Sequence, residues 1–125
     1  IGKINDFEKR YLFEKTHLMV MPTLDESQNR SIEGFGIVYL EASFFSIPSI
    51  ASNIGGTPEA VINNFTGIII NKIEDLYISI NNLLNDEKKI KNFGVNAQKR
   101  AIKEFNWTYI SKKYFSLIND IINKN

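Results

Sequence analysis

The stretch Ser31-Ile32-Glu33-Gly34-Phe35-Gly36-Ile37-Val38-Tyr39-Leu40-Glu41-Ala42 decides how the chain is arranged. A loop with two glycines runs into an almost wholly apolar helix, which we expect over about Phe35 to Phe45. Glu41 stands among the apolar residues of that helix, so the pattern predicts burial on most sides. A carboxylate that loses its hydration is strongly destabilised unless a polar group meets it. Glu41 therefore needs a partner.

Composition and charge exclude several classes of protein. The 125 residues suffice for one domain, and 43% hydrophobic with 23% charged residues is typical of globular chains. The net charge of +1 gives no sign of a nucleic-acid partner. The absence of cysteine excludes disulfides and fits a reducing compartment. We therefore expect a cytoplasmic location, with peripheral attachment to the inner membrane face as an alternative.

No segment of the sequence resembles a membrane span or a secretion signal. No apolar run approaches the roughly 20 residues of a spanning helix, and the N-terminus has no signal-peptide pattern. The chain also opens on Ile1 without a starting Met. We therefore expect a piece of a longer protein.

Short apolar runs alternate with helical patterns along the chain. Three runs predict strands, namely Leu18–Met21, Ser49–Ser52 and Ile68–Ile70, and Ile1–Ile4 could form a strand stub. Strands that alternate with helices imply right-handed crossovers and a parallel sheet. The sequence thus predicts an α/β fold with flanking helices and a helical C-terminal tail.

Capping signals mark where the helices begin. Asn5 and Glu8 have the spacing of a capping box. Thr57 suits an N-cap, with Pro58 at the first helical position. Further helices are expected from Glu74, after the cap Asp86 and from about Thr108, whose apolar side carries Ile110, Tyr114, Leu117, Ile118, Ile121 and Ile122.

The glycine loop has the chemistry of an anion site. Ligands of open parallel sheets lie at the carboxyl ends of the strands, where the Gly34–Gly36 amides and the start of the next helix suit phosphate oxygens. Glu33 and Glu41 repel anions but accept hydrogen bonds from hydroxyls. A sugar nucleotide has phosphates between two polyols and fits this pattern. The spacing alone also allows a plain turn, with Glu41 paired to a lysine at a helix end.

The run from Glu33 to Ala42 resembles the E-x7-E motif of retaining glycosyltransferases with the GT-B fold, family 4 and its relatives. Further resemblances follow in the same order along nearly the whole chain. They are Met21-Pro22-Thr23, the block from Pro48 to Glu59, Thr66-Gly67-Ile68-Ile69, Asn96-Ala97 and Phe105-Asn106-Trp107. The resemblance implies a Rossmann-like parallel sheet, here an incomplete GT-B donor half-domain spanning 1–125.

The resemblance also implies roles for individual residues. Glu33 matches the glutamate that contacts hydroxyls of the transferred sugar, and is the implied catalytic residue. Glu41 matches the glutamate that hydrogen-bonds the ribose of the nucleotide. Gly55-Gly56 matches a tight structural turn. The donor-binding backbone is that of Gly34, Phe35, Gly36 and Ile37.

The resemblance implies a retaining hexosyl- or related glycosyltransferase of carbohydrate biosynthesis. It would move a sugar from a nucleotide diphosphate sugar to a hydroxyl of a sugar, glycan, lipid or protein acceptor. The resemblance implies no metal and no cofactor. The missing N-terminal acceptor domain would pack against the C-terminal helix, and this piece alone would be inactive. The alternatives are a non-catalytic sugar-nucleotide-binding or interaction module and a GT-B nucleotide-sugar epimerase.

Some residues depart from the family pattern or have other expected roles. Ser46 stands where the family usually has glycine, which could change a helix C-cap. The loop from Pro22 to Glu33 is longer than in many members. The Arg and Lys that neutralise the diphosphate have no counterpart here. We expect His17 to be structural or at the surface and Trp107 to anchor the last helix. In the empty protein, water or a backbone amide should satisfy Glu41.

Overall fold

The computed structural model describes residues 2–23 and 34–123. Within them a parallel sheet contains β1 (Met19–Met21), β2 (Ser49–Ser52) and β3 (Gly67–Ile70) in the order β1-β2-β3. Val20 pairs with Ile50, and Ile50 pairs with Ile68. All residues of β2 are buried because it lies between the other two strands. The predicted α/β parallel sheet is confirmed.

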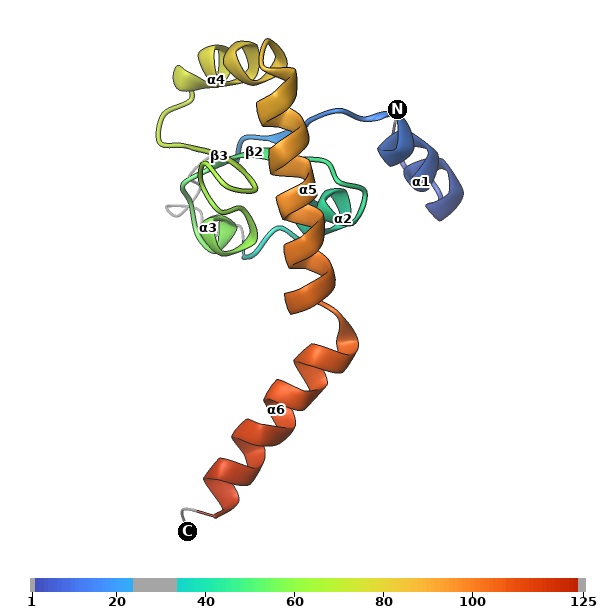
Figure 1. The fold of residues 1–125 in the computed structure, drawn as a ribbon, viewed down its shortest axis with the longest axis vertical. Coiled ribbons are helices and arrows are strands. Elements are labelled where there is room, and N and C mark those ends of the chain that lie inside the picture. The colour runs from blue at the N-terminus through green and yellow to red at the C-terminus, as the bar shows by residue number, and fades with distance from the viewer. Residues whose placement is uncertain (1, 24–33, 124–125) are drawn as a thin grey trace.

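In the described residues, helices and strands alternate in the expected order from α1 to α4, and α5 and α6 come after them (Figure 1). Helix α2 begins two residues later than expected, and residues 2–4 form no strand stub. The helices are α1 (Asp6–Lys15), α2 (Ile37–Phe44), α3 (Thr57–Ala60), α4 (Asp75–Leu84), α5 (Glu87–Glu104) and α6 (Trp107–Ile122).

The core lies on both faces of the sheet because successive side chains of a strand point to opposite sides. Ala51 packs with Tyr39 of α2 and with Ala60 of α3. Ile50, its neighbour, packs on the other face with Leu83 of α4 and Phe93 of α5 among others. The sheet therefore lies between two helical layers, and α2 and α3 are fixed on the same side.

Side-chain caps begin three of the helices. Asn5 Oδ1 accepts from the amide of Glu8 at 2.9 Å, and the Glu8 carboxylate accepts from the Asn5 amide, which confirms the capping box. Asp86 Oδ1 accepts from the amide of Lys89 at 2.8 Å, as predicted. The Asn106 side chain accepts from the amide of Tyr109 and begins α6.

The prediction for Thr57 is wrong. Gly56 is the N-cap of α3, and Thr57 is the first helical residue, with Pro58 after it. The fully buried Thr57 hydroxyl donates back to the carbonyl oxygens of Ser52 and Ile54. The side chain that suits a cap is used to close the turn that leaves β2.

Ser46 ends α2 in a left-handed conformation, with φ of 59°. Its amide donates to the carbonyl of Ser43 at 3.0 Å, and the Ile47 amide donates to that of Ala42 at 3.1 Å. This is a Schellman motif, in which glycine usually occupies the left-handed position. Helix α5 crosses closely here, since a Cβ on Gly94 would overlap the Ser46 carbonyl. The C-cap therefore keeps its usual hydrogen bonds, with Ser46 in the left-handed position.

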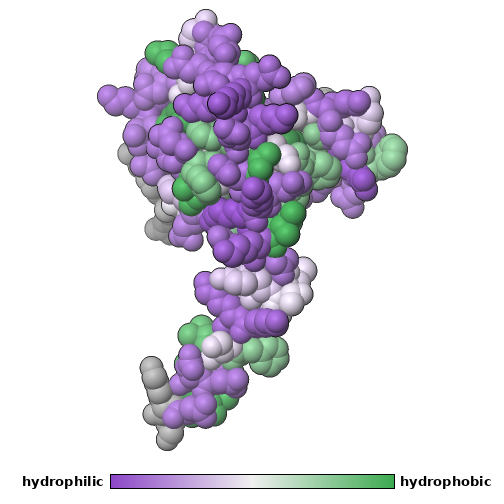
Figure 2. Space-filling view, in the orientation of Figure 1, coloured by the Kyte–Doolittle hydropathy of each residue, from purple (hydrophilic) through white to green (hydrophobic). Residues whose placement is uncertain are grey.

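Helix α6 extends away from the sheet beyond the end of α5 (Figure 1). No residue of α6 is buried, and Trp107 is 85% exposed, so the prediction that Trp107 anchors this helix is wrong. Figure 2 shows hydrophobic and hydrophilic groups alternating along this extension. None of the helices in the described ranges is both long and apolar enough to cross a membrane.

Replacing Ser46 with glycine should stabilise the protein. A residue with a Cβ pays about 1 kcal/mol to hold the left-handed region, and glycine does not. We expect Ser46→Gly to raise the free energy of unfolding of the full-length protein by roughly 0.5–1 kcal/mol in denaturant titration. Ser46→Ala keeps a Cβ and is the matched control, which should gain much less. Equal effects of the two substitutions would contradict the conformational explanation.

Candidate functional site

Two backbone loops meet at the carboxyl ends of β1 and β2. The Gly56 amide, in the turn after β2, donates to the Gly34 carbonyl, in the loop before α2, with a nitrogen–oxygen distance of 2.6 Å. A Cβ on Gly56 would overlap that carbonyl. Gly55 has a φ of 56°, in the left-handed region that favours glycine. The expectation that Gly55-Gly56 is a tight structural turn is confirmed.

Gly36 begins α2 in a left-handed conformation, with φ of 77°. A Cβ there would lie 2.5 Å from two ring carbons of Tyr39, so a side chain is excluded both by conformation and by space. The Tyr39 ring is fully buried, and its hydroxyl donates to the Met21 carbonyl at 2.7 Å. The first turn of α2 is thereby tied to the end of β1.

The start of α2 has features that suit an anion. No side chain of the described residues caps this helix, although the first amides of a helix have no partner within it. A Cβ on Gly34 would meet nothing within 4 Å, and Ile37 is 71% exposed. The backbone N–H groups at a helix start and the positive end of the helix together favour an anion.

Phe35 fixes the loop between its two glycines. Its ring lies against that of Phe105, with centroids 5.6 Å apart. The Arg100 guanidinium stacks over the same Phe105 ring, 4.8 Å from its centroid. The loop is therefore supported from the C-terminal end of α5.

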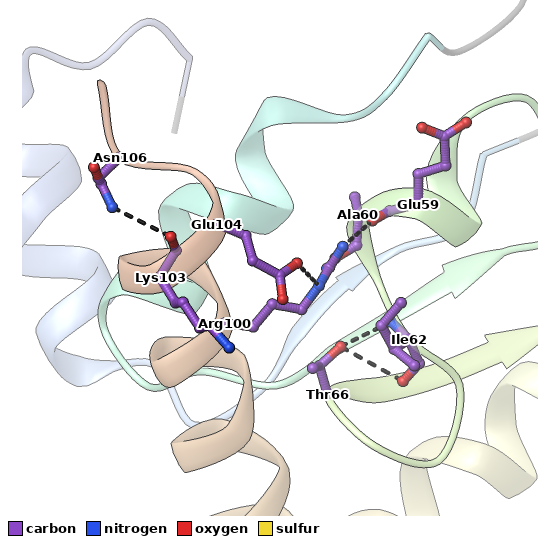
Figure 3. Close-up of polar contacts among 8 residues, drawn as sticks. All are labelled: Glu59, Ala60, Ile62, Thr66, Arg100, Lys103, Glu104 and Asn106. Carbon is purple, nitrogen blue, oxygen red and sulfur yellow. Dashed lines mark hydrogen bonds and ion pairs between the residues drawn. The ribbon is translucent and has the colours of Figure 1, made fainter. Parts of the chain in front are cut away.

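Arg100 joins α5 to the end of α3 (Figure 3). Its Nη1 donates to the Ala60 carbonyl at 2.8 Å and its Nη2 to the Glu59 carbonyl at 2.7 Å. Its Nε pairs with Glu104 at 3.0 Å, and the side chain is only 15% exposed. Sequence reasoning missed this residue. The four-residue spacing of Arg100 and Glu104 is visible in the sequence, but it is common on helix surfaces.

Glu41 is neither buried nor unpaired. Its Oε1 accepts from Lys9 Nζ of α1 at 2.8 Å, and the side chains of Lys9 and Glu41 are 40% and 36% exposed. The expectation that water or a backbone amide meets Glu41 in the empty protein is wrong, and the alternative of a lysine partner is the one observed. The hydrogen bond to Glu41 and its negative charge raise the pKa of the Lys9 ammonium.

The remaining expected residues fall outside this arrangement. Glu33, the implied catalytic residue, lies outside the described residues. His17 is exposed, as a surface role requires. In ranges 2–23 and 34–123, no three His, Asp or Glu side chains are grouped closely enough to hold a metal ion.

The sequence matches a known family over most of its length. Residues 1–100 match the family described as glycosyl transferases group 1. The chain belongs to this family.

Curated relatives carry names of glycosyltransferases. The chain is 30% identical over 92 residues to a GDP-mannose-dependent phosphatidylinositol monomannoside mannosyltransferase of Mycolicibacterium smegmatis, covering 72% of this chain and 24% of the relative. It is 34% identical over 92 residues to the capsular polysaccharide glycosyltransferase CapM of Staphylococcus aureus, again covering 72% of this chain and 24% of the relative. The chain thus spans about a quarter of the length of these proteins.

Solved structures share the fold. Sucrose-phosphate synthase from Thermosynechococcus elongatus superposes with a TM-score of 0.80 at 25% identity, covering all of this chain and 30% of that one. HepE from Anabaena, solved in complex with UDP, gives a TM-score of 0.74 at 23% identity over 87% of this chain and 29% of that one. The three-stranded sheet and its helices are therefore a Rossmann-like part of the GT-B fold, as expected.

Gly56→Ala should disturb the loop contact, whereas Gly34→Ala should not. The first substitution places a methyl group against the Gly34 carbonyl, and overpacking of this kind costs about 1–3 kcal/mol. The second places its methyl group in open space. We expect a lower melting temperature for full-length Gly56→Ala and a nearly unchanged one for Gly34→Ala. Equal stability of the two variants would show that the loops do not depend on this contact.

Proposed function

We propose that this chain is the C-terminal part of the donor-binding domain of a retaining glycosyltransferase. The parent protein would transfer a hexosyl or related sugar from a nucleotide diphosphate sugar to a hydroxyl acceptor. The observation that carries the proposal is the uncapped start of α2 between two touching glycine loops at the strand ends. The family match and a structural relative solved with UDP support it.

The backbone of the loop would bind the diphosphate. The amides near Gly34, Phe35, Gly36 and Ile37 lie where a helix dipole favours negative charge. The contacts of Gly34 with Gly56 and of Phe35 with Phe105 hold this backbone in place before a ligand arrives. Fixed donors stabilise the charge that develops on a leaving group without reorganising during the reaction. We propose that the diphosphate departs without a metal ion because these fixed donors stabilise its charge.

The two glutamates would bind the hydroxyls on either side of the phosphates. Glu41 is half exposed one turn into α2, where an ionised carboxylate can accept from the ribose hydroxyls. Glu33 would position the transferred sugar by its match to the family motif. Ionised carboxylates only accept hydrogen bonds, which suits hydroxyl donors.

The remaining parts of the protein complete the proposal. The apolar side of α6 is exposed and would pack against an N-terminal acceptor domain, with the family's diphosphate-binding Arg and Lys supplied by preceding sequence. This piece alone would not turn over. The cysteine-free sequence fits a cytoplasmic location.

Removing the Glu41 carboxylate should weaken nucleotide binding. A hydrogen bond to a charged group contributes about 1.5–3 kcal/mol, so we expect Glu41→Ala to raise the Kd for UDP or GDP by roughly tenfold or more in calorimetric titration of the full-length protein. The matched control is Glu87→Ala, an exposed glutamate in the first turn of α5, which should leave the Kd unchanged.

Three results would contradict the proposal. An unchanged nucleotide affinity in Glu41→Ala would remove the ribose role. Inversion of the anomeric configuration in the product, read by NMR with a synthetic hydroxyl acceptor, would exclude a retaining transferase. Release of an epimerised sugar without any acceptor would favour the epimerase instead.

A further inference from the structure

Lys9 joins helix α1 to the proposed ribose-binding carboxylate. Its Nζ lies 2.8 Å from Glu41 Oε1 and 3.9 Å from Asp6 Oδ1, whose side chain is fully exposed. The pair connects residues 32 positions apart in the sequence, so it depends on how α1 and α2 are placed. We propose that Lys9 is a positioning residue for the nucleotide ribose, because it holds the Glu41 carboxylate in the orientation that accepts from the ribose hydroxyls. The inference rests on the ribose role of Glu41.

The Lys9–Glu41 pair leaves acceptor sites on the carboxylate that a ribose can use. Lys9 uses one donor on Oε1, whereas an ionised carboxylate offers about four lone-pair sites on two oxygens. The 2′- and 3′-hydroxyls of a ribose are neighbouring donors and can bind the remaining sites together. The carboxylate therefore need not release Lys9 when the nucleotide binds.

Glu41 also acts on Lys9. The hydrogen bond to the carboxylate and its negative charge raise the pKa of Lys9, so Lys9 stays a charged donor to Glu41.

A second contact holds α1 against α2 and so supports the Lys9–Glu41 pair. It has no buried residue, and its Phe13 ring stacks on Phe45, at the end of α2, with centroids 5.3 Å apart. The stacking ring and the Lys9 pair lie four residues apart on α1, on one side of the helix. An ordinary surface ion pair needs no such support, and exposed pairs of that kind contribute at most about 1 kcal/mol to stability.

The test compares ribonucleotides with nucleotides whose sugar lacks the 2′- and 3′-hydroxyls. Kd values for UDP and GDP, and for their 2′,3′-dideoxy forms, are measured with the full-length protein and its variants at constant ionic strength. The readout is the ratio of the dideoxy Kd to the ribonucleotide Kd. A general loss of positive charge, or a structural disturbance, weakens both ligands and cancels in this ratio.

Lys9→Met should lower this ratio by roughly two- to fivefold, the range that an exposed charged pair can supply. Lys9→Arg keeps a charged donor and should restore most of the ratio. Adding Lys9→Met to Glu41→Ala should cause no further fall, because the residue acts through Glu41. Arg10→Met is the matched control, since Arg10 forms an exposed pair with Glu14 on the same helix and should leave the ratio unchanged.

The outcomes separate this inference from the proposed function. A ratio that falls in Glu41→Ala but not in Lys9→Met would overturn the role of Lys9 and leave that of Glu41. A rise in Lys9→Met would show that Lys9 withholds Glu41 from the ligand, which also overturns the inference. A ratio unchanged in Glu41→Ala, or no binding of UDP and GDP, would remove the ribose role and the role of Lys9 with it.

Discussion

The hydrogen bond from the Gly56 amide to the Gly34 carbonyl is the contact on which the site depends. Here the missing Cβ of Gly56 lets backbone touch backbone, because a methyl group would overlap the carbonyl. The carbonyl of the loop is thereby turned towards the protein. In the proposed function, the backbone that begins α2 faces the diphosphate.

A second layer of contacts keeps that backbone in place. The Tyr39 hydroxyl holds α2 against the end of β1, while Phe35 rests on Phe105 at the end of α5. Arg100 stacks on the same Phe105 and satisfies two carbonyls at the end of α3. The Arg100 guanidinium thus links α5 to the end of α3, and its positive charge is favourable at the negative end of the α3 backbone. Side chains outside the proposed donor-binding backbone therefore set the geometry of that backbone.

The sequence predicted what local patterns determine, and failed where a distant partner decides. The apolar runs fixed the three strands, and the short-range caps Asn5 and Asp86 have the predicted partners. Thr57 satisfied a local rule for caps, but its hydroxyl found carbonyls in the preceding turn. Trp107 is a large aromatic residue of the kind that can anchor a helix, but its side chain is exposed in the described chain. Such outcomes depend on the tertiary neighbours, which periodicity does not contain.

The pairing of Glu41 with Lys9 also resolves an electrostatic difficulty of the proposed site. Glu41 lies four positions after Ile37, which is about 6 Å along the helix axis. Two unit negative charges at about 6 Å repel by roughly 3 kcal/mol at an effective dielectric constant of about 20. An unpaired carboxylate would therefore oppose the diphosphate that the helix start attracts. With an ammonium 2.8 Å from Oε1, the pair is close to neutral, while the carboxylate keeps its acceptor sites. One helix can then offer donors to phosphates and acceptors to a ribose.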